Sequence, residues 1–198
     1  MPSTEGPPLA GVVLCGGGST RMGRDKALIE IDGVPLFQVV AHRLAHAAWP
    51  VFLAPGRTGR LGEVGYPNLT DAEPDAGPLG GIVSALRASP HDRVAVVAVD
   101  MPFASGDVFR LLADRIGEAN AAVPVTSDGP QPLHAVFARS ALPALEQALV
   151  DGSRSVKGAL QTLQVRMVGP DEWHSADPSG RFAVNVNRPE DLASIAAG

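Results

Sequence analysis

Short, almost entirely apolar runs alternate along this chain with segments whose apolar residues recur at helical spacing. The runs are rich in Val, Ala and Leu and cover Ala10–Cys15, Pro50–Ala54, Val94–Val99, Ala121–Val125 and Leu133–Phe137. Runs of this kind are typical of strands that are buried on both faces of a sheet. The alternation predicts an α/β fold with an open, mostly parallel, doubly wound (Rossmann-like) sheet and helices on both faces.

The intervening segments have the periodicity of helices that bury one face. The apolar positions are Leu36, Val40, Leu44 and Ala47 in one helix, Leu79, Ile82, Val83 and Leu86 in the next, and Val108, Leu111, Leu112 and Ile116 in a third. Pro35 and Pro78 suit the starts of the first two helices. A short extra strand is expected at Ala27–Ile31, ahead of a tight turn at Asp32-Gly33.

Length and charge limit the classes of function. A chain of 198 residues fits one domain and buries roughly 70% of the surface that its unfolded form exposes. The net charge of −5, with Lys and Arg spread thinly, argues against a nucleic-acid partner. Residues 1–8 are expected to form a frayed arm, since they lack the pattern of a signal peptide. No run approaches the roughly 18 apolar residues of a membrane span, so we expect a cytoplasmic protein.

A glycine-rich loop follows the first expected strand. Gly16-Gly17-Gly18 continues into Ser19-Thr20-Arg21-Met22-Gly23-Arg24-Asp25-Lys26. Consecutive glycines allow backbone N–H groups to approach an anion, and the basic side chains add positive charge. The string lacks the Lys-Ser/Thr pair of a P-loop and the glycine spacing of a dinucleotide fingerprint. The loop therefore indicates a phosphate site of another kind; the alternative is a glycine-rich turn with solvated charges.

A single carboxylate ends the most apolar of the expected strands. Val94–Val99 runs into Asp100-Met101-Pro102-Phe103. In a doubly wound sheet ligands bind outside the carboxyl ends of the strands, and Mg²⁺ typically takes one or two carboxylates together with phosphate oxygens. Asp100 is thus a candidate Mg²⁺ ligand. The alternative is a helix N-cap, a position for which Asp107 is expected to compete better.

Polar residues elsewhere complete the candidate site. Asp71 precedes Gly77-Pro78-Leu79-Gly80-Gly81, a string that opens the second helix and offers free N–H groups. Asn185 and Asn187 share one side of an expected strand that starts near Arg181 and precedes a final helix near Pro189. The alternatives are that Asn187 caps that helix and that the Asp71 carboxylate hydrogen-bonds the backbone of its own loop.

These strings, taken in order, resemble the signatures of the molybdenum cofactor guanylyltransferases. The resemblance runs from Leu9 to about Leu192 and is carried by Leu-x-Gly-Gly-x₃-Arg-Met-Gly-x-Asp-Lys, Gly-Pro-Leu-Gly-Gly, Asp-Met-Pro-Phe and Asn-x-Asn-x-Pro-Glu-x-Leu. Two departures stand out. Cys15 replaces the usual Ala, and the second strand ends in Ala54-Pro55 where some relatives place an Asn near the base.

The resemblance implies transfer of GMP from GTP to molybdopterin, with Mg²⁺ as cofactor and cofactor-delivery or molybdoenzyme proteins as possible partners. It implies catalytic roles for Lys26, Arg21 and Asp100, with Asp100 as the metal ligand. It implies nucleotide binding by Leu14, Cys15, Gly16, Gly17, Lys26, Asp71 and Asp100, and acceptor binding by Asn185, Asn187 and Arg154.

Alternatives remain on the same fold. CTP with molybdopterin, or another phosphorylated acceptor, would use the same chemistry, although Gly16-Gly17 and Asp25-Lys26 resemble the guanylyl type. A non-catalytic nucleotide or cofactor carrier is the other alternative, against which Asp100 and Lys26 argue. Gln131–Ala135 resembles an acceptor-side strand or is simply structural. His42 and His46 lie one turn apart but are expected on a helix flank, and Cys15, the only cysteine, is expected to be a small buried residue.

Overall fold

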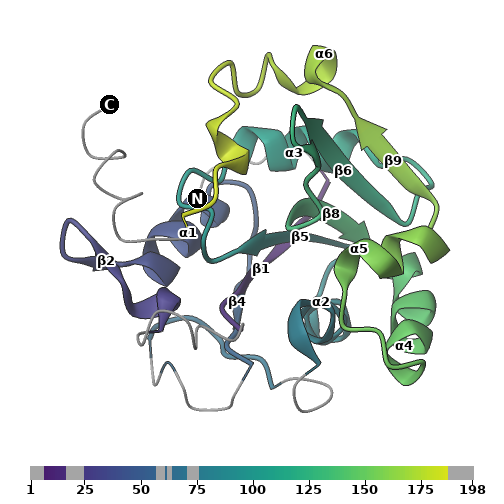
Figure 1. Cartoon of the computed structure of the whole chain (residues 1–198), viewed down its shortest axis with the longest axis horizontal. Coiled ribbons are helices and arrows are strands. Elements are labelled where there is room, and N and C mark those ends of the chain that lie inside the picture. The colour runs from purple at the N-terminus through teal and green to yellow at the C-terminus, as the bar shows by residue number, and fades with distance from the viewer. Residues whose placement is uncertain (1–6, 17–24, 57–60, 62–63, 71–75, 187–198) are drawn as a thin grey trace.

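The computed structural model describes residues 7–16, 25–56, 61, 64–70 and 76–186 (Figure 1). Of the candidate site residues, Gly17, Arg21, Asp71 and Asn187 lie outside these ranges. So do most of the expected N-terminal arm and the expected final helix near Pro189.

A seven-stranded mixed sheet forms the centre of the molecule. Its strands are β1 (Ala10–Leu14), β4 (Val51–Ala54), β5 (Arg93–Ala98), β6 (Ala121–Thr126), β7 (Gly129–Pro130), β8 (His134–Ala138) and β9 (Val165–Val168). The order is β4-β1-β5-β8-β6-β7, with β9 also pairing with β6. All five expected strands are present, each within about a residue of its expected bounds.

One central strand runs against its neighbours, and the two-residue β7 is likewise antiparallel to β6. Strand β8 is antiparallel to both β5 and β6, whereas β1, β4 and β5 are mutually parallel and β9 is parallel to β6. Only residues 127–133 connect β6 to β8, and a parallel connection needs about a dozen residues or more to cross over. The sheet is therefore mostly parallel, as expected, with an antiparallel strand that the apolar pattern does not reveal.

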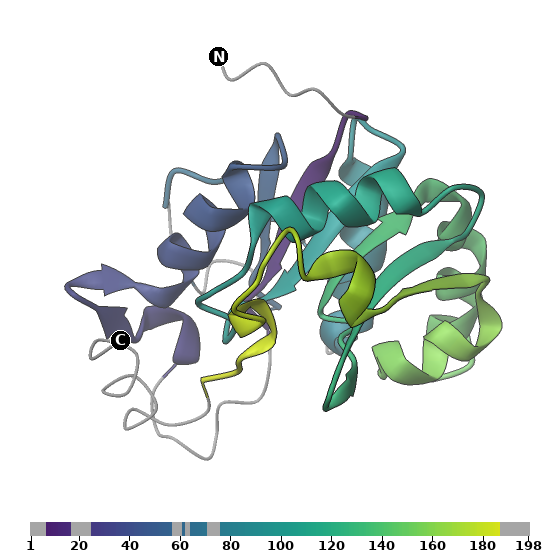
Figure 2. The same cartoon turned by 90° about the horizontal axis from the view of Figure 1, so that it is seen from above.

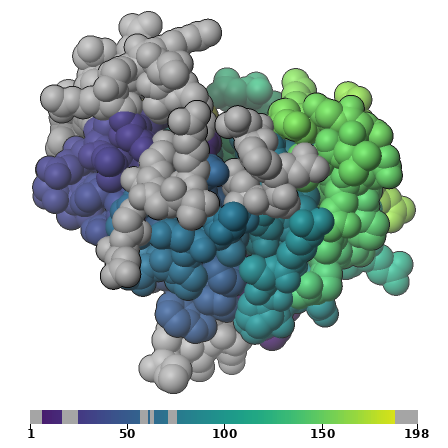
Figure 3. Space-filling view, turned by 90° about the horizontal axis from the view of Figure 1, so that it is seen from below, coloured from purple at the N-terminus to yellow at the C-terminus, as the bar shows by residue number. Residues whose placement is uncertain are grey.

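Helices cover both faces of the sheet. They are α1 (Leu36–Ala45), α2 (Gly77–Ala88), α3 (Gly106–Arg115), α4 (Leu142–Val150), α5 (Val156–Ala159) and α6 (Pro170–Trp173). Helices α1, α3 and α6 pack on one face and α2, α4 and α5 on the other. Figure 2 shows α1 (blue) and α3 (teal) on the same side of the strands, and Figure 3 shows the teal residues of α2 between purple-blue and green segments.

The two cores explain why the strands read as continuous apolar runs. Along β1, Val13 belongs to the core beneath α1 and α3, whereas Val12 and Leu14 belong to the core beneath α2 and α4. Successive side chains of a strand point to opposite faces, so a strand covered on both faces must be apolar throughout. The prediction of a doubly wound sheet is confirmed.

The expected cap of α3 and the expected start of the extra strand need correction, whereas the tight turn at Asp32-Gly33 is confirmed. The N-cap of α3 is Ser105, whose hydroxyl accepts a hydrogen bond from the Val108 N–H; Asp107 lies in the first turn. Residues expected to begin a strand at Ala27 instead form a short 3-10 helix, η2 (Lys26–Leu28), because the Asp25 carboxylate accepts the Ala27 N–H. The extra strand is only β2 (Glu30–Ile31), which turns through Asp32 and Gly33, both at positive φ, into β3 (Val34–Pro35).

The strand expected near Arg181 is also wrong. Residues Arg181–Ala183 form a 3-10 helix, η5, that follows Gly180 in the left-handed region. The Asp177 carboxylate accepts the N–H groups of Ser179 and Phe182, which folds the chain back on itself. Phe182 is fully buried as a result, packed against Trp173 and His134. Within the described ranges, no helix is both long and apolar enough to cross a membrane.

Candidate active site

The carboxyl ends of β1, β4 and β5 are tied together by backbone hydrogen bonds. The N–H groups of Cys15 and Gly16 both donate to the Ala54 carbonyl, at 2.9 and 3.1 Å, and the Val99 N–H donates to the Leu14 carbonyl at 3.1 Å. The chain therefore leaves β1 for the glycine-rich loop at a rigid edge. This is the edge at which doubly wound sheets bind their ligands.

Lys26 and Asp100 meet at this edge although 74 residues separate them. The Lys26 ammonium lies 3.4 Å from the Asp100 carboxylate, and the two side chains are 22% and 24% exposed. Lys26 is positioned by η2, which is held by the Asp25 cap and by the fully buried Ala27. A pair this accessible contributes little to stability, so the arrangement is better explained by a ligand than by the fold.

Three backbone hydrogen bonds hold the loop that begins at Asp100. The N–H of Met101 donates to the Ala98 carbonyl, the N–H of Ala104 donates to the Met101 carbonyl, and the Asp100 carbonyl accepts the Val186 N–H at 2.8 Å. Met101 is buried and anchors the turn. Since Ser105 caps α3, Asp100 is not the N-cap of that helix, and its carboxylate remains directed toward Lys26.

The hydrogen bond to Val186 brings the carboxyl-terminal segment to the same place. Asn185 is its neighbour and is exposed, and its amide donates only weakly, at 3.4 Å, to the Ala183 carbonyl. The structure thus places Asn185 beside the Asp100 loop, as the motif order suggests. Asn187 lies outside the described residues.

The start of α2 packs closely on the ends of β1 and β4. A Cβ on Gly81 would lie 2.7 Å from Leu14 Cδ2 and 3.0 Å from Ala54 Cβ, and one on Gly16 would lie 3.2 Å from the Gly56 Cα. A Cβ on Gly77 would contact the Arg154 carbonyl oxygen at 3.5 Å. Arg154 therefore lies at the α2 N-terminus, where its guanidinium donates to the carbonyls of Leu149 and Ser153.

Leu14 and Cys15 are buried, so their side chains face the cores and only their backbone lines the edge of the sheet. The Cys15 thiol donates to the Val13 carbonyl at 3.6 Å. This placement agrees with the prediction of a small buried residue.

A buried histidine supports the loop between Asp100 and α3, and sequence reasoning gave it only an undecided role. His134, on β8, has no exposed surface; its Nε2 accepts the Ser105 N–H at 3.2 Å, and its ring stacks on Phe109 at 3.9 Å. Burial lowers the pKa of His134 from 6.5 to about 3. The imidazole ring is thus neutral. The only sequence feature that could have indicated this buried histidine is its position within an apolar strand.

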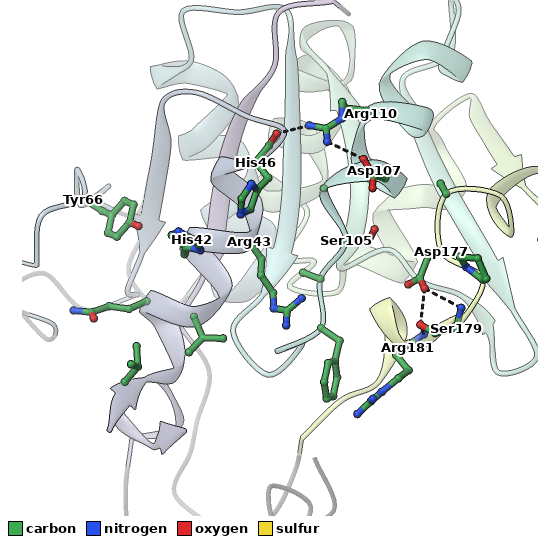
Figure 4. Close-up of a pocket in the computed structure, with 18 residues that line it drawn as sticks. His42, Arg43, His46, Tyr66, Ser105, Asp107, Arg110, Asp177, Ser179 and Arg181 are labelled. Atoms are coloured by element: carbon green, nitrogen blue, oxygen red, sulfur yellow. Dashed lines mark hydrogen bonds and ion pairs between the residues drawn. The ribbon is translucent and has the colours of Figure 1, made fainter. Parts of the chain in front are cut away.

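A groove lies beside this loop, between α1 and α3. Its volume is about 1130 Å³, and it is lined by Val34, Gln38, Val39, His42, Arg43, His46, Tyr66, Phe103, Ala104, Ser105, Gly106, Asp107, Arg110, Ala176, Asp177, Pro178, Ser179 and Arg181 (Figure 4). Sequence reasoning missed it, because its walls come from four separate segments without a motif. His42 and His46 line it with ring centroids 5.1 Å apart, and no set of three potential metal ligands gathers in the part of the chain that is described.

The Asp100 site fits a hard divalent cation. Its accessible carboxylate is of the type that Mg²⁺ prefers, and an ion with one protein carboxylate relies on ligand phosphates and water for its other positions. The neighbouring Lys26 suits the same phosphates.

Comparison with known proteins identifies the family of the chain. The model of the MobA-like NTP transferase domain matches residues 11–167. The chain belongs to this family. It is therefore a nucleotidyltransferase, as its motifs predict.

Individual members of the family match over nearly the whole chain. A probable molybdenum cofactor guanylyltransferase of Chloroflexus aggregans is 31% identical over 208 residues, covering 96% of this chain and 94% of that protein. One from a Nostoc species is 34% identical, covering 94% and 90%. The crystal structure of molybdopterin-guanine dinucleotide biosynthesis protein A from Archaeoglobus fulgidus superposes with a TM-score of 0.83 at 25% identity, covering 95% and 98%. The resemblance to the guanylyltransferases is confirmed.

Proposed function

We propose that this nucleotidyltransferase transfers GMP from GTP to the terminal phosphate of molybdopterin, with Mg²⁺ as cofactor. The names of its relatives support this substrate pair. The observation that carries the proposal is the accessible Lys26–Asp100 pair at the carboxyl edge of the sheet, with Asn185 beside it. An ammonium and a metal-binding carboxylate at one point suit a reaction between two polyanions.

The reaction needs charge neutralisation more than it needs a base. A phosphate monoester has a second pKa of about 6 and is already largely anionic at neutral pH. In the proposed step a terminal oxygen of the acceptor phosphate attacks the α-phosphorus in line. The new P–O bond forms as the bond from the α-phosphorus to the β-phosphate oxygen breaks, and pyrophosphate leaves with that electron pair. Orientation and electrostatic stabilisation then account for catalysis.

Each candidate residue has a place in this scheme. Lys26, with Arg21 and the amides of Gly16 and Gly17, would neutralise the charge that develops on pyrophosphate. Asp100 would hold Mg²⁺, which supplies charge neutralisation between the two phosphates. Backbone of Leu14 and Cys15 would border the nucleotide, and Asp71 would contact its nucleoside.

Acceptor binding would fall to residues around the Asp100 loop and the start of α2. Asn185 and Asn187 would hydrogen-bond the acceptor, and Arg154 would hold one of its charged groups near Gly77. Proteins that deliver the acceptor or receive the product are further proposed partners.

Nucleotide selectivity is the first test. Binding of GTP, CTP, ATP and UTP with Mg²⁺ is measured by calorimetry, and pyrophosphate release is followed with and without molybdopterin. We expect selective GTP binding, with release only when molybdopterin is present. A preference for CTP would leave the mechanism and change the nucleotide, whereas binding without turnover on a competent acceptor would favour a carrier.

Asp100→Asn tests the role of the carboxylate. We expect loss of turnover with retention of GTP binding in the absence of metal, because the amide keeps the size of the side chain and removes the metal ligand. Asp171→Asn, at an exposed position in α6, is the matched control and should behave like the wild type. An active Asp100→Asn enzyme would refute the scheme.

A further inference from the structure

The groove between α1 and α3 contains two guanidinium groups whose contacts are with an aromatic ring and not with a carboxylate. Arg43 reaches into it from α1 and Arg181 from the opposite wall (Figure 4). Both stand over the ring of Phe103, at 5.8 and 4.0 Å from its centroid. Among the described residues neither guanidinium forms an ion pair with a carboxylate.

The groove also holds a third arginine and two carboxylates. Arg110 forms an ion pair with Asp107 at 2.7 Å and also donates to the His46 carbonyl. The Asp177 carboxylate accepts hydrogen bonds from Ser179 and Phe182. Arg43 and Arg181 therefore face the single carboxylate of Asp177, and the arginines and carboxylates of the groove leave a net positive charge.

The groove adjoins the reaction site. Phe103 belongs to the loop that begins at Asp100, and Arg181 belongs to the segment that Val186 ties to the Asp100 carbonyl. A ligand with its phosphate at the Lys26–Asp100 pair can thus extend over Phe103 into a groove of about 1130 Å³. This volume is at the upper end of the range for small-molecule pockets.

We propose that this groove binds the body of the acceptor, the part that carries no reacting phosphate, through Arg43 and Arg181. The proposal rests on the proposed function, because the acceptor is taken from there. A planar guanidinium stacks on flat rings and binds oxo or anionic groups through paired N–H donors, so the two arginines suit a flat, oxygen-bearing heterocycle such as a pterin. The closeness of the groove to Asp100 favours this small molecule over an acidic peptide.

Fluorescence titration of a pterin monophosphate, without nucleotide, tests the groove directly. Wild-type protein should bind this probe, and Arg43→Gln and Arg181→Gln should each raise its Kd at least about tenfold, the scale of one hydrogen bond to a charged group. The Kd for GTP, measured by calorimetry, should stay the same. Arg115→Gln, at an exposed position that pairs with Glu172, is the matched control and should change neither value.

A lysine variant separates the hydrogen bonds of the Arg181 guanidinium to the probe from its charge over Phe103. Arg181→Lys keeps the charge over Phe103 but loses the fork of donors, so its Kd for the probe should fall between those of wild type and Arg181→Gln. In turnover assays the glutamine variants should raise the KM for the acceptor by the same factor as the Kd.

Several results would overturn the proposal. An unchanged Kd for the probe in the double glutamine variant would remove the groove from acceptor binding. A parallel loss of GTP affinity would show that the arginines support the fold or the nucleotide site instead. Binding of a polyglutamate peptide, with no binding of the probe, would make the groove a docking surface for protein. If the probe binds through both arginines while no nucleotide releases pyrophosphate, the groove assignment stands and the proposed function fails.

Discussion

Acidification is expected to destabilise this protein through the buried imidazole of His134. In the folded protein its Nε2 accepts the Ser105 N–H, so the neutral ring carries its proton on Nδ1, which has no partner in the described structure. A second proton would have to displace the Ser105 N–H in a site without solvent. Burial therefore lowers the pKa of His134 to about 3, against the attraction of the nearby Asp177.

The size of the effect follows from the two pKa values of His134. Between 6.5 in the unfolded chain and about 3 in the folded one, only the unfolded chain binds the proton. Each unit of acidification in this window lowers the free energy of unfolding by about 1.4 kcal/mol, to a limit of about 5 kcal/mol. The folded protein therefore has its full free energy of unfolding above pH 6.5, and His134 lowers that free energy progressively as the pH falls toward 3. At pH 5 the loss is about 2 kcal/mol, or about 4–8 °C in Tm for a protein of this size.

Urea unfolding, followed by circular dichroism at pH 7 and pH 5, measures this loss. His134→Gln keeps an acceptor for the Ser105 N–H and removes the titrating group. Wild type should lose about 2 kcal/mol more than this variant between the two pH values, since all other titrations are shared. His174→Gln, which removes an exposed imidazole, is the matched control. Equal losses in wild type and His134→Gln would refute the reasoning.

Two further substitutions test the edge of the sheet. Lys26→Ala should lower kcat by more than about 10²-fold, the scale for removing a pre-placed electrostatic stabiliser. Its free energy of unfolding should change by less than about 1 kcal/mol, because the ion pair with Asp100 is accessible to solvent. Lys157→Ala is the control, and a near-normal kcat in Lys26→Ala would exclude Lys26 from the mechanism. Gly81→Ala should destabilise by about 1–3 kcal/mol in urea unfolding, since its Cβ would lie 2.7 Å from Leu14 Cδ2, whereas a Cβ at Gly158 meets only ordinary contacts. Equal stability of Gly81→Ala and Gly158→Ala would contradict the close packing.

Most of the fold could be predicted because burial on both faces leaves a simple trace in the sequence. Strands β1, β4 and β5 read as apolar runs because Val12 and Val13 point into different cores. Direction leaves no such trace: β8 is as apolar as its neighbours, and only the short connection after β6 indicates that it is antiparallel. No helix or strand was predicted between residues 139 and 180, where the structure has α4, α5, β9 and α6.

Two wrong predictions, the cap of α3 and the strand near Arg181, concern positions where alternative local structures are similar in energy. Asp107 is as good a cap by composition as Ser105, but the Ser105 N–H is fixed by His134, 29 residues away. The expected strand at Arg181 gives way to a turn because Asp177 accepts backbone N–H groups and Phe182 fills a space beside His134. Both outcomes depend on contacts between segments that are distant in sequence.

Some residues of the candidate site could be placed from the sequence, and others could not. The proximity of residues that follow strand ends could be predicted, because the carboxyl ends of parallel strands lie at one edge of the sheet whatever the length of the connections. Lys26 and Asp100 meet for this reason although they lie 74 positions apart in the sequence. Arg43 and Arg181 share no such rule: one lies within α1, the other follows a turn, and only the packing of α1 beside α3 places them over the same ring. Topology alone thus places the candidate reaction site at one edge of the sheet. The proposed acceptor groove depends instead on side-chain packing between distant segments, so substitutions of Arg43 and Arg181 are expected to change acceptor affinity and to leave nucleotide affinity unchanged.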